Sequence, residues 1–172
     1  MPMTYLVVSD LHGSSKGLDL LQAAVFMQKP DVLIVLGDIL FGSYDGNEGA
    51  MQRYFRSLTI PVLGVRGNCD FADDARSLGF ELPEQRTFTF AGRTFHLQHR
   101  PWCASFEPGD VALCGHTHVK CLYKEAGVFY LNPGSLGRPR DDGPGFAVIN
   151  DEGIALYDAS KFIPIKSLKY AS

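Results

Sequence analysis

Residues 5–12 read YLVVSDLH, an apolar run that ends abruptly in polar side chains. Four consecutive apolar residues are typical of a strand that is buried on both faces, as in the middle of a parallel sheet. A turn follows at Gly13, and apolar residues then recur at three- and four-residue spacings until Pro30. The segment therefore predicts a buried strand at residues 5–8 and a helix at about 15–29.

The same pattern occurs twice more in the first half of the chain. Residues 32–36 and 61–65 are short apolar runs that end at Gly37-Asp38 and Gly67-Asn68. A glycine-rich loop and a helix at about 47–58 separate them. Strands that alternate with helices indicate right-handed crossovers and a parallel sheet, so this half is predicted to be α/β.

From residue 86 onward the pattern changes to short segments separated by turns. Turns at residues 91–93, 125–127 and 150–153 indicate hairpins. This half is therefore predicted to be rich in β-structure. Its predicted strands are residues 87–90, 94–98, 111–114, 121–123, 128–131, 146–149 and 154–157.

The composition is that of one globular domain, which we expect to span residues 1–172. The chain is 45% hydrophobic and 20% charged, with a formal net charge of -3. The sequence contains no run of Lys and Arg that would bind nucleic acid or an anionic membrane. No apolar stretch approaches the roughly 20 residues of a membrane span. The apolar run at residues 5–8 is far shorter than the core of a signal peptide and has no basic segment before it, so we expect no signal peptide. The four cysteines form no CxxC pair, so we expect free thiols and a cytoplasmic location. The composition is compatible with a monomer and with a homo-oligomer.

Potential metal ligands follow five of the predicted strands. Each taken alone has an ordinary structural explanation, because a carboxylate after a strand is usually a helix cap or a turn residue, and a single histidine is usually structural. The combination favours a metal site, since the carboxyl ends of the strands bring these residues into one crevice. The candidate metal ligands are Asp10, His12, Asp38, Asn68, His99, His116 and His118.

The ligand types indicate which ions would bind. Carboxylate, imidazole and amide groups without thiolate suit Mn, Fe, Co, Ni or Zn. Seven candidate ligands are too many for one ion that keeps an open position, so we expect two divalent ions that share a carboxylate. Such a pair holds a bridging hydroxide for in-line attack at phosphorus. Two dications outweigh the charges of Asp10, Asp38 and one hydroxide, so the pocket would attract an anionic phosphoester.

The ordered motifs resemble those of the calcineurin-like metallophosphoesterase superfamily, and most closely its small bacterial and archaeal phosphodiesterases. The similarity runs from about residue 5 to residue 157, nearly the whole chain. The matching stretches are DLH at 10–12, GD at 37–38, GNCD at 67–70, His99, GHTH at 115–118 and NPGS at 132–135.

The resemblance implies a four-layer αββα sandwich, in which two mixed β-sheets are flanked by helices. It implies that one ion binds Asp10, His12 and His118. The other ion binds Asn68, His99 and His116, and Asp38 bridges the two. On the same basis Asp38, Asn68 and His99 are the candidate catalytic residues, and manganese is the first choice of metal, ahead of iron, nickel, cobalt and zinc.

The chain departs from the family pattern at two places. Cys69 stands where many members have a histidine that protonates the leaving group, and a thiol is a poorer proton donor for an alkoxide. Arg100-Pro101 follows His99 where the family commonly has Gly-His. Cys69, Asp70 and Arg138 are further candidates to contact the ligands or the substrate phosphate. Their alternative roles are packing for Cys69, helix capping for Asp70 and a solvated surface position for Arg138.

These observations favour a metal-dependent phosphodiesterase that acts on a small phosphoester. The alternatives are a phosphomonoesterase or nucleotidase, and a non-catalytic scaffold like the retromer subunit of the same superfamily. The presence of all seven ligands favours the enzyme.

The two histidines near the end of the strand at 94–98 are predicted to differ in role. Side chains alternate along a strand, so His99 shares a face with Phe95 and Leu97 and points inward, whereas His96 points to the opposite face.

Overall fold

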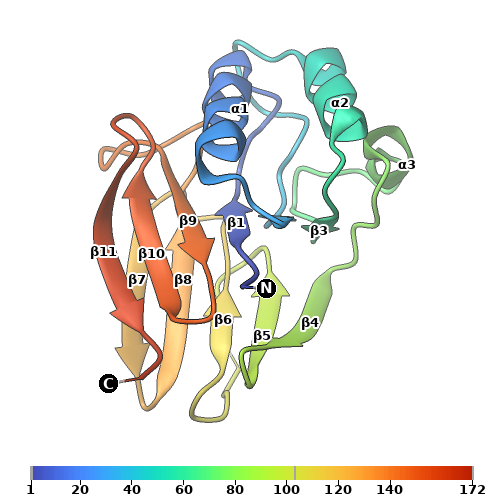
Figure 1. The fold of residues 1–172 in the computed structure, drawn as a ribbon. Helices are drawn as coiled ribbons and strands as arrows, with labels where there is room; N and C mark the ends of the chain where they lie inside the picture. Colours follow the sequence, from blue (N-terminus) through green and yellow to red (C-terminus); the bar gives the residue numbers. More distant parts are fainter. Residues whose placement is uncertain (1, 103, 172) are drawn as a thin grey trace.

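Two β-sheets lie face to face, and the helices cover the outer face of the larger sheet (Figure 1). This computed structural model describes residues 2–102 and 104–171. The six-stranded sheet has the order β11-β10-β9-β1-β2-β3, and the five-stranded sheet has the order β4-β5-β6-β8-β7. Both sheets are mixed, and the fold is α/β as predicted.

The first half of the chain forms the parallel part of the larger sheet. Strands β1 (Tyr5–Val8), β2 (Val32–Val35) and β3 (Val62–Gly64) are parallel neighbours. Helices α1 (Ser15–Gln28) and α2 (Glu48–Ser57) connect them, which confirms the predicted crossovers. A side-chain cap begins each of these two helices.

Ser14 accepts a hydrogen bond from the backbone N–H of Gly17 in α1, and Asn47 accepts one from that of Ala50 in α2. A third and shorter helix, α3 (Asp74–Leu78), follows β3.

The second half forms a hairpin at each of the three predicted turns. The hairpins are β4–β5, β7–β8 and β9–β10, and β9 pairs antiparallel with β1, so the last hairpin extends the larger sheet. The strands are β4 (Gln85–Phe90), β5 (Arg93–Gln98), β6 (Val111–Leu113), β7 (Lys120–Glu125), β8 (Val128–Pro133), β9 (Gly145–Ile149), β10 (Gly153–Asp158) and β11 (Ile163–Lys169).

Strand β1 contributes to two separate hydrophobic cores. Tyr5 and Val7 face the smaller sheet, where they pack in a core that includes Phe95 of β5. Leu6 and Val8 face the helices, in a core with residues such as Leu21 of α1. Burial on both faces explains why this strand is an unbroken apolar run.

Only one of the two helical layers implied by the resemblance is present in the described residues. All three helices contribute to the core on the larger sheet. On the outer face of the smaller sheet lie aromatic side chains of the connection between β5 and β6, whose described residues form no helix. There Trp102 and Phe106 pack against His96 and each other. Pro101 and Pro108 in this connection disfavour a helix.

Within the described ranges, no helix combines the length and apolar character needed to cross a membrane. Cys69, Cys114 and Cys121 are free thiols. The fourth cysteine, Cys103, lies outside the described residues.

Candidate metal centre

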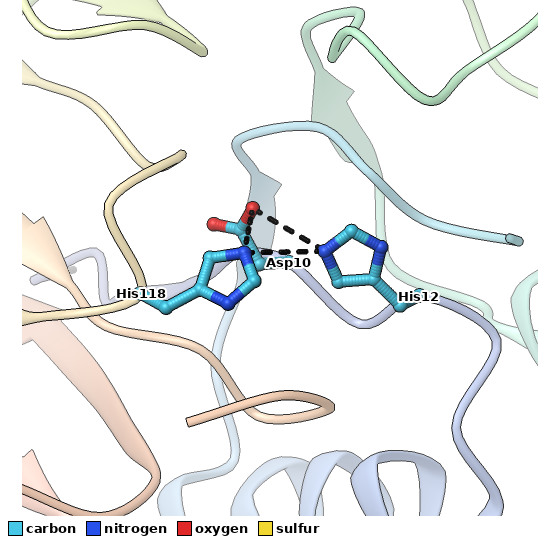
Figure 2. A group of neighbouring side chains, drawn as sticks. All are labelled: Asp10, His12 and His118. Atoms are coloured by element: carbon cyan, nitrogen blue, oxygen red, sulfur yellow. Dashed lines mark hydrogen bonds and ion pairs between the residues drawn. The ribbon is translucent and has the colours of Figure 1, made fainter. Parts of the chain in front are cut away.

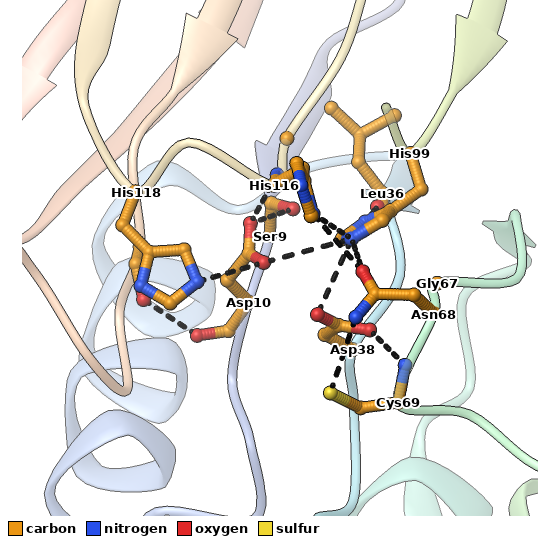
Figure 3. A network of polar contacts seen from close by, with 12 residues as sticks. Ser9, Asp10, Leu36, Asp38, Gly67, Asn68, Cys69, His99, His116 and His118 are labelled. Carbon is orange, nitrogen blue, oxygen red and sulfur yellow. Dashed lines mark hydrogen bonds and ion pairs between the residues drawn. The ribbon is translucent and has the colours of Figure 1, made fainter. Parts of the chain in front are cut away.

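The structure brings all seven predicted metal ligands together at one end of the two sheets (Figures 2 and 3). Each lies just beyond the carboxyl end of a strand, where loops of α/β proteins place their functional groups. Asp10 and His12 follow β1, Asp38 follows β2, Asn68 follows β3, His99 follows β5, and His116 and His118 follow β6.

Asp10, His12 and His118 form a first ligand group (Figure 2). The Nε2 atom of His118 lies 3.2 Å from Oδ1 of Asp10, and that of His12 lies 3.8 Å from the same oxygen. The two Nε2 atoms are 3.2 Å apart. All three residues are buried, and these atoms converge on one small space.

The second group is formed by Asp38, Asn68, His99 and His116 (Figure 3). Nε2 of His99 lies 3.2 Å from Oδ2 of Asp38 and 2.9 Å from Oδ1 of Asn68. The same Asn68 oxygen is 3.0 Å from Nδ1 of His116. Oδ2 of Asp38 is also 3.7 Å from Nε2 of His12. Asp38 therefore stands between the two groups.

Three of the histidines have their rings fixed by backbone carbonyls. Nδ1 lies 2.7 Å from the carbonyl of Phe41 in His12, of Leu36 in His99 and of Arg138 in His118. A carbonyl only accepts hydrogen bonds, so Nδ1 donates its proton and Nε2 of the neutral ring keeps a free lone pair. Metal-binding histidines are oriented in this way.

The free acceptor atoms are arranged to receive a cation. In the neutral tautomers, the lone pairs of His12 and His118 face each other across 3.2 Å, which is unfavourable without a proton or a metal between them. Oδ1 of Asp10 is buried and lacks a hydrogen-bond partner among the described residues. Imidazole, carboxylate and amide donors suit divalent transition metals. The residues therefore fit divalent ions of this kind.

The charges of the second group are strongly coupled. Burial raises the pKa of the Asp38 carboxyl, but the hydrogen bond and charge of His99 outweigh the effect of burial. The pKa of Asp38 is therefore lowered to about 2. Burial lowers the pKa of His99, yet its contact with Asp38 leaves that pKa above the usual value. Burial, together with the nearby His99 and Arg100, lowers the pKa of His116. The group thus holds its carboxylate ionised, as a metal ligand requires.

The backbone is strained at five of the seven candidate ligands. A positive φ is uncommon for residues other than glycine, and such residues gather at functional sites. The φ angles are 53° at Asp10, 51° at His12, 53° at Asp38, 69° at His116 and 61° at His118. The sharp turns that these angles create direct successive side chains into one space.

Two glycines next to the ligands are required by close approach. A Cβ atom at Gly67 would lie 2.1 Å from Oδ1 of Asp38, and one at Gly115 would lie 2.1 Å from Oγ of Ser9. Neither position has room for a side chain. The glycines of the Gly-Asn and Gly-His pairs therefore let neighbouring loops pack against the carboxylates.

Several supporting side chains were not singled out from the sequence. Ser9 donates a 2.6 Å hydrogen bond to Oδ2 of Asp10, and Ser135 donates one of 2.6 Å to the backbone carbonyl of Asp10. Asn132 donates to the carbonyl of Gly115 at 2.9 Å. The available signals were the Asn-Pro-Gly-Ser stretch, which contains Asn132 and Ser135, and the position of Ser9 at the end of a buried strand.

Arg138 and Cys69 contribute both backbone groups and side chains to the candidate metal centre. The Arg138 carbonyl orients His118, and its guanidinium donates to the carbonyl of Gly42 at 2.8 Å. The backbone N–H of Cys69 donates to Oδ1 of Asp38 at 2.8 Å. Both side chains also line the cleft beside the ligands.

Asp70 holds the loops rather than the ligand side chains. Its carboxylate accepts hydrogen bonds from the backbone N–H groups of Asp38 at 2.8 Å, Gly67 at 2.7 Å and Ile39 at 2.9 Å. The N-cap of α3 is Asp73, so Asp70 does not cap that helix. Its carboxylate joins the loop after β2 to the loop after β3.

We predict that Asp70→Ala destabilises the fold by about 3 kcal/mol, because three backbone N–H groups lose their acceptor and each unsatisfied buried donor costs about 1–3 kcal/mol. Urea unfolding of the metal-free protein measures the change. Asp73→Ala is the matched control, since Asp73 is exposed and makes no side-chain capping bond. Equal midpoints for the two variants would contradict this role of Asp70.

His96 and His99 lie on opposite faces of β5 and its extension, as the alternation of side chains predicts. Nε2 of His96 lies 3.0 Å from Oδ2 of Asp110, and its ring packs on Phe106 outside the smaller sheet. His99 lies among the candidate ligands. The predicted strand register is therefore confirmed.

The fold and the ligand cluster define a class of protein. A two-sheet α/β fold that gathers histidine and carboxylate groups at its strand ends provides a candidate metal centre of the kind that can activate water for hydrolysis. The domain model of the calcineurin-like phosphoesterase superfamily matches residues 3–152, and the chain belongs to that superfamily. The resemblance seen in the sequence motifs is thus confirmed.

Individual relatives share most of the chain's length. Phosphodiesterase YfcE of Escherichia coli strain K12 is 27% identical over 160 residues, which cover 83% of this chain and 84% of the relative. The solved structure of the E. coli phosphoesterase Yfce superimposes with a TM-score of 0.90 at 20% identity, covering 98% of this chain and all of the other. A zinc complex of Vps29 from Entamoeba histolytica gives a TM-score of 0.68 at 18% identity, with 98% and 99% coverage.

Proposed function

We propose that the protein is a phosphodiesterase that depends on two divalent metal ions. Asp10, His12 and His118 would hold one ion, and Asn68, His99 and His116 would hold the other. Asp38 would bind both. The observation that carries the proposal is the convergence of unprotonated histidine nitrogens on Asp38 and on the unpartnered oxygen of Asp10. Manganese is the first choice of metal, and iron, nickel, cobalt and zinc have suitable ligands here too.

The protein's own part in this chemistry is mainly to fix geometry and charge. When bound, a pair of divalent ions activates water and neutralises the charge that develops on the phosphoryl group. Asp38 and His99 keep their positions because the Cys69 N–H and the Leu36 carbonyl hold them. Asn68 lines the cleft, where its amide lies within reach of a bound phosphoester. We therefore assign the catalytic roles to Asp38, Asn68 and His99.

An open cleft beside the ligands favours an enzyme over a protein-binding platform. The cavity measures about 1000 Å³ and is lined by ligands from both groups, including His12, Asp38 and His116. Metal binding alone does not separate the two functions, because the similar Vps29 fold has a zinc complex. Diester hydrolysis is favoured over monoester hydrolysis because the curated relative is a phosphodiesterase.

A comparison of two chromogenic esters tests this function. The purified protein is stripped of metal, reloaded with Mn²⁺, and assayed with bis(p-nitrophenyl) phosphate and p-nitrophenyl phosphate. We expect faster hydrolysis of the diester and loss of activity after chelation. Faster hydrolysis of the monoester would support a phosphomonoesterase instead. Rates no higher than those of Mn²⁺ in buffer would support the non-catalytic platform.

Cys69 should make hydrolysis sensitive to the leaving group. Burial and the neighbouring Asp38 carboxylate raise the pKa of its thiol, so the thiol is a weak proton donor to a departing alkoxide. We predict that log kcat falls steeply as leaving-group pKa rises and that aryl esters react faster than alkyl esters. Cys69→His should flatten the plot, whereas Cys121→Ser, a change outside the ligand cluster, should not. A flat plot for the unmodified protein, with chemistry shown to limit the rate, would refute this prediction.

A further inference from the structure

The cleft extends well beyond the candidate metal ligands. Its volume of about 1000 Å³ is at the upper end of the ~300–1,000 Å³ typical of small-molecule sites, and one phosphoryl group fills only a small part of it. Lys16, Tyr44, Arg138 and Arg140 form a further part of its lining. A large substituent of the phosphoester can therefore lie against these residues.

This part of the cleft is positively charged in a protein whose net charge is negative. Lys16, Arg138 and Arg140 line it, and Asp45 is its one carboxylate apart from the ligand Asp38. Asp45 is already engaged, because it accepts hydrogen bonds from the Ser14 hydroxyl and the Lys16 backbone N–H. The ion pairs among the described residues include neither Lys16 nor Arg140. Their charges are thus free for a second anionic group.

Tyr44 places an aromatic ring at the same cleft. Its side chain is fully exposed, with a relative accessibility of 106%. An aromatic ring that rests on no protein neighbour beside a ligand cleft is available to stack on a planar group.

The loop that carries Tyr44 is held at both ends. Arg138 donates to the carbonyl of Gly42 at 2.8 Å, and Asn47 donates its N–H to the carbonyl of Gly13 at 2.7 Å. A bridge between Ser14 and Gly46 adds a further tie. The ring therefore sits on a preformed loop, which lowers the entropy lost when a ligand stacks on it.

We propose that this region selects phosphodiesters with a nucleotide substituent: Tyr44 stacks on the base, and Arg140 with Lys16 binds a further phosphate. A nucleotide unites the two features that the cleft can recognise, a planar aromatic group and a second negative charge. This assignment rests on the proposed phosphodiesterase function, since it names the substrate class of the same site.

Two esters with the same leaving group test the assignment. They are methyl p-nitrophenyl phosphate and the 5′-(p-nitrophenyl phosphate) of thymidine 3′-phosphate, and the measured quantity is the ratio of their kcat/KM values. Tyr44→Ala and Arg140→Gln should each lower the preference for the nucleotide ester about tenfold, as expected from the loss of one stacking or one charged contact. Tyr44→Phe should retain the preference because it keeps the ring.

Controls separate a local effect from a general one. Phe26→Ala and Arg53→Gln alter an exposed aromatic ring and an exposed arginine elsewhere on the surface, so the preference should stay unchanged. If Tyr44→Ala or Arg140→Gln also leaves the ratio unchanged, the assignment is wrong even though the phosphodiesterase function stands.

Binding of thymidine 3′,5′-bisphosphate, measured by calorimetry, tests the cleft without turnover. We expect about tenfold weaker binding to the Tyr44→Ala variant than to the unmodified protein. Equal binding, or no binding to either, would overturn the assignment. Failure of both esters to be hydrolysed would instead count against the proposed function.

Discussion

Replacing Asp38 with alanine will reduce hydrolysis by at least about a thousandfold and weaken the binding of both metal ions. Its carboxylate lies between the two ligand groups, 3.2 Å from Nε2 of His99 and 3.7 Å from Nε2 of His12. No other side chain is proposed to bind both ions. Loss of one group that stabilises a transition state already costs about a hundred- to a thousandfold, and here the ions that it holds are lost as well.

Metal content after dialysis, measured together with the rate, checks this prediction. His118→Ala is the matched variant, because His118 belongs to the first ligand group alone and should lower the occupancy of chiefly one ion. If Asp38→Ala protein kept two equivalents of metal and turned over at a near-normal rate, the shared-carboxylate arrangement would be wrong.

The second large effect is a difference in activity and metal content between variants of two histidines that are three residues apart. His99→Ala should lose one ion and nearly all turnover, because its Nε2 lies among the ligands and its Nδ1 is fixed by the Leu36 carbonyl. His96→Ala should keep its metal and most of its activity. The contacts of His96 are with Asp110 and Phe106 on the outer face of the smaller sheet.

A stability measurement accompanies this comparison. Loss of the His96–Asp110 hydrogen bond should cost about 1 kcal/mol of unfolding free energy, which is too little to unfold the protein. A pair of variants with the opposite pattern, inactive at His96 and active at His99, would show that the wrong face of β5 has been assigned to the centre.

The local sequence was sufficient to predict the central strands and the position of the ligands. Strands β1 and β2 are unbroken apolar runs because both of their faces are buried, and each ends at a residue of the cluster. The alternation of Phe95, Leu97 and His99 predicted which histidine points inward. These predictions succeeded because burial and strand periodicity are properties of neighbouring residues.

Other features depend on contacts between distant segments. Strand β11 was not predicted, because it is mostly exposed and contains Pro164, and it forms by pairing with β10. Asp70 was considered as a helix cap, but its partners are backbone groups from two separate loops. The carbonyl of Arg138 orients His118, a role that its side-chain chemistry does not indicate.

The missing helical layer has a similar origin. The family resemblance implied helices on both outer faces, yet Trp102 and Phe106, from the connection between β5 and β6, lie on the outer face of the smaller sheet instead. The prolines in this connection are visible in the sequence, but whether its aromatic side chains pack on the sheet depends on outward-facing residues such as Tyr130.

Titration of the metal-free protein with Mn²⁺ tests the dinuclear centre most directly. Hydrolysis of bis(p-nitrophenyl) phosphate is followed as metal is added in steps at a protein concentration well above the dissociation constants. The rate should rise to a plateau at two equivalents per chain, because Asp38 lies between the two ligand groups and is proposed to bind an ion of each. A plateau at one equivalent, or no hydrolysis at any amount of metal, would contradict a dinuclear phosphodiesterase centre.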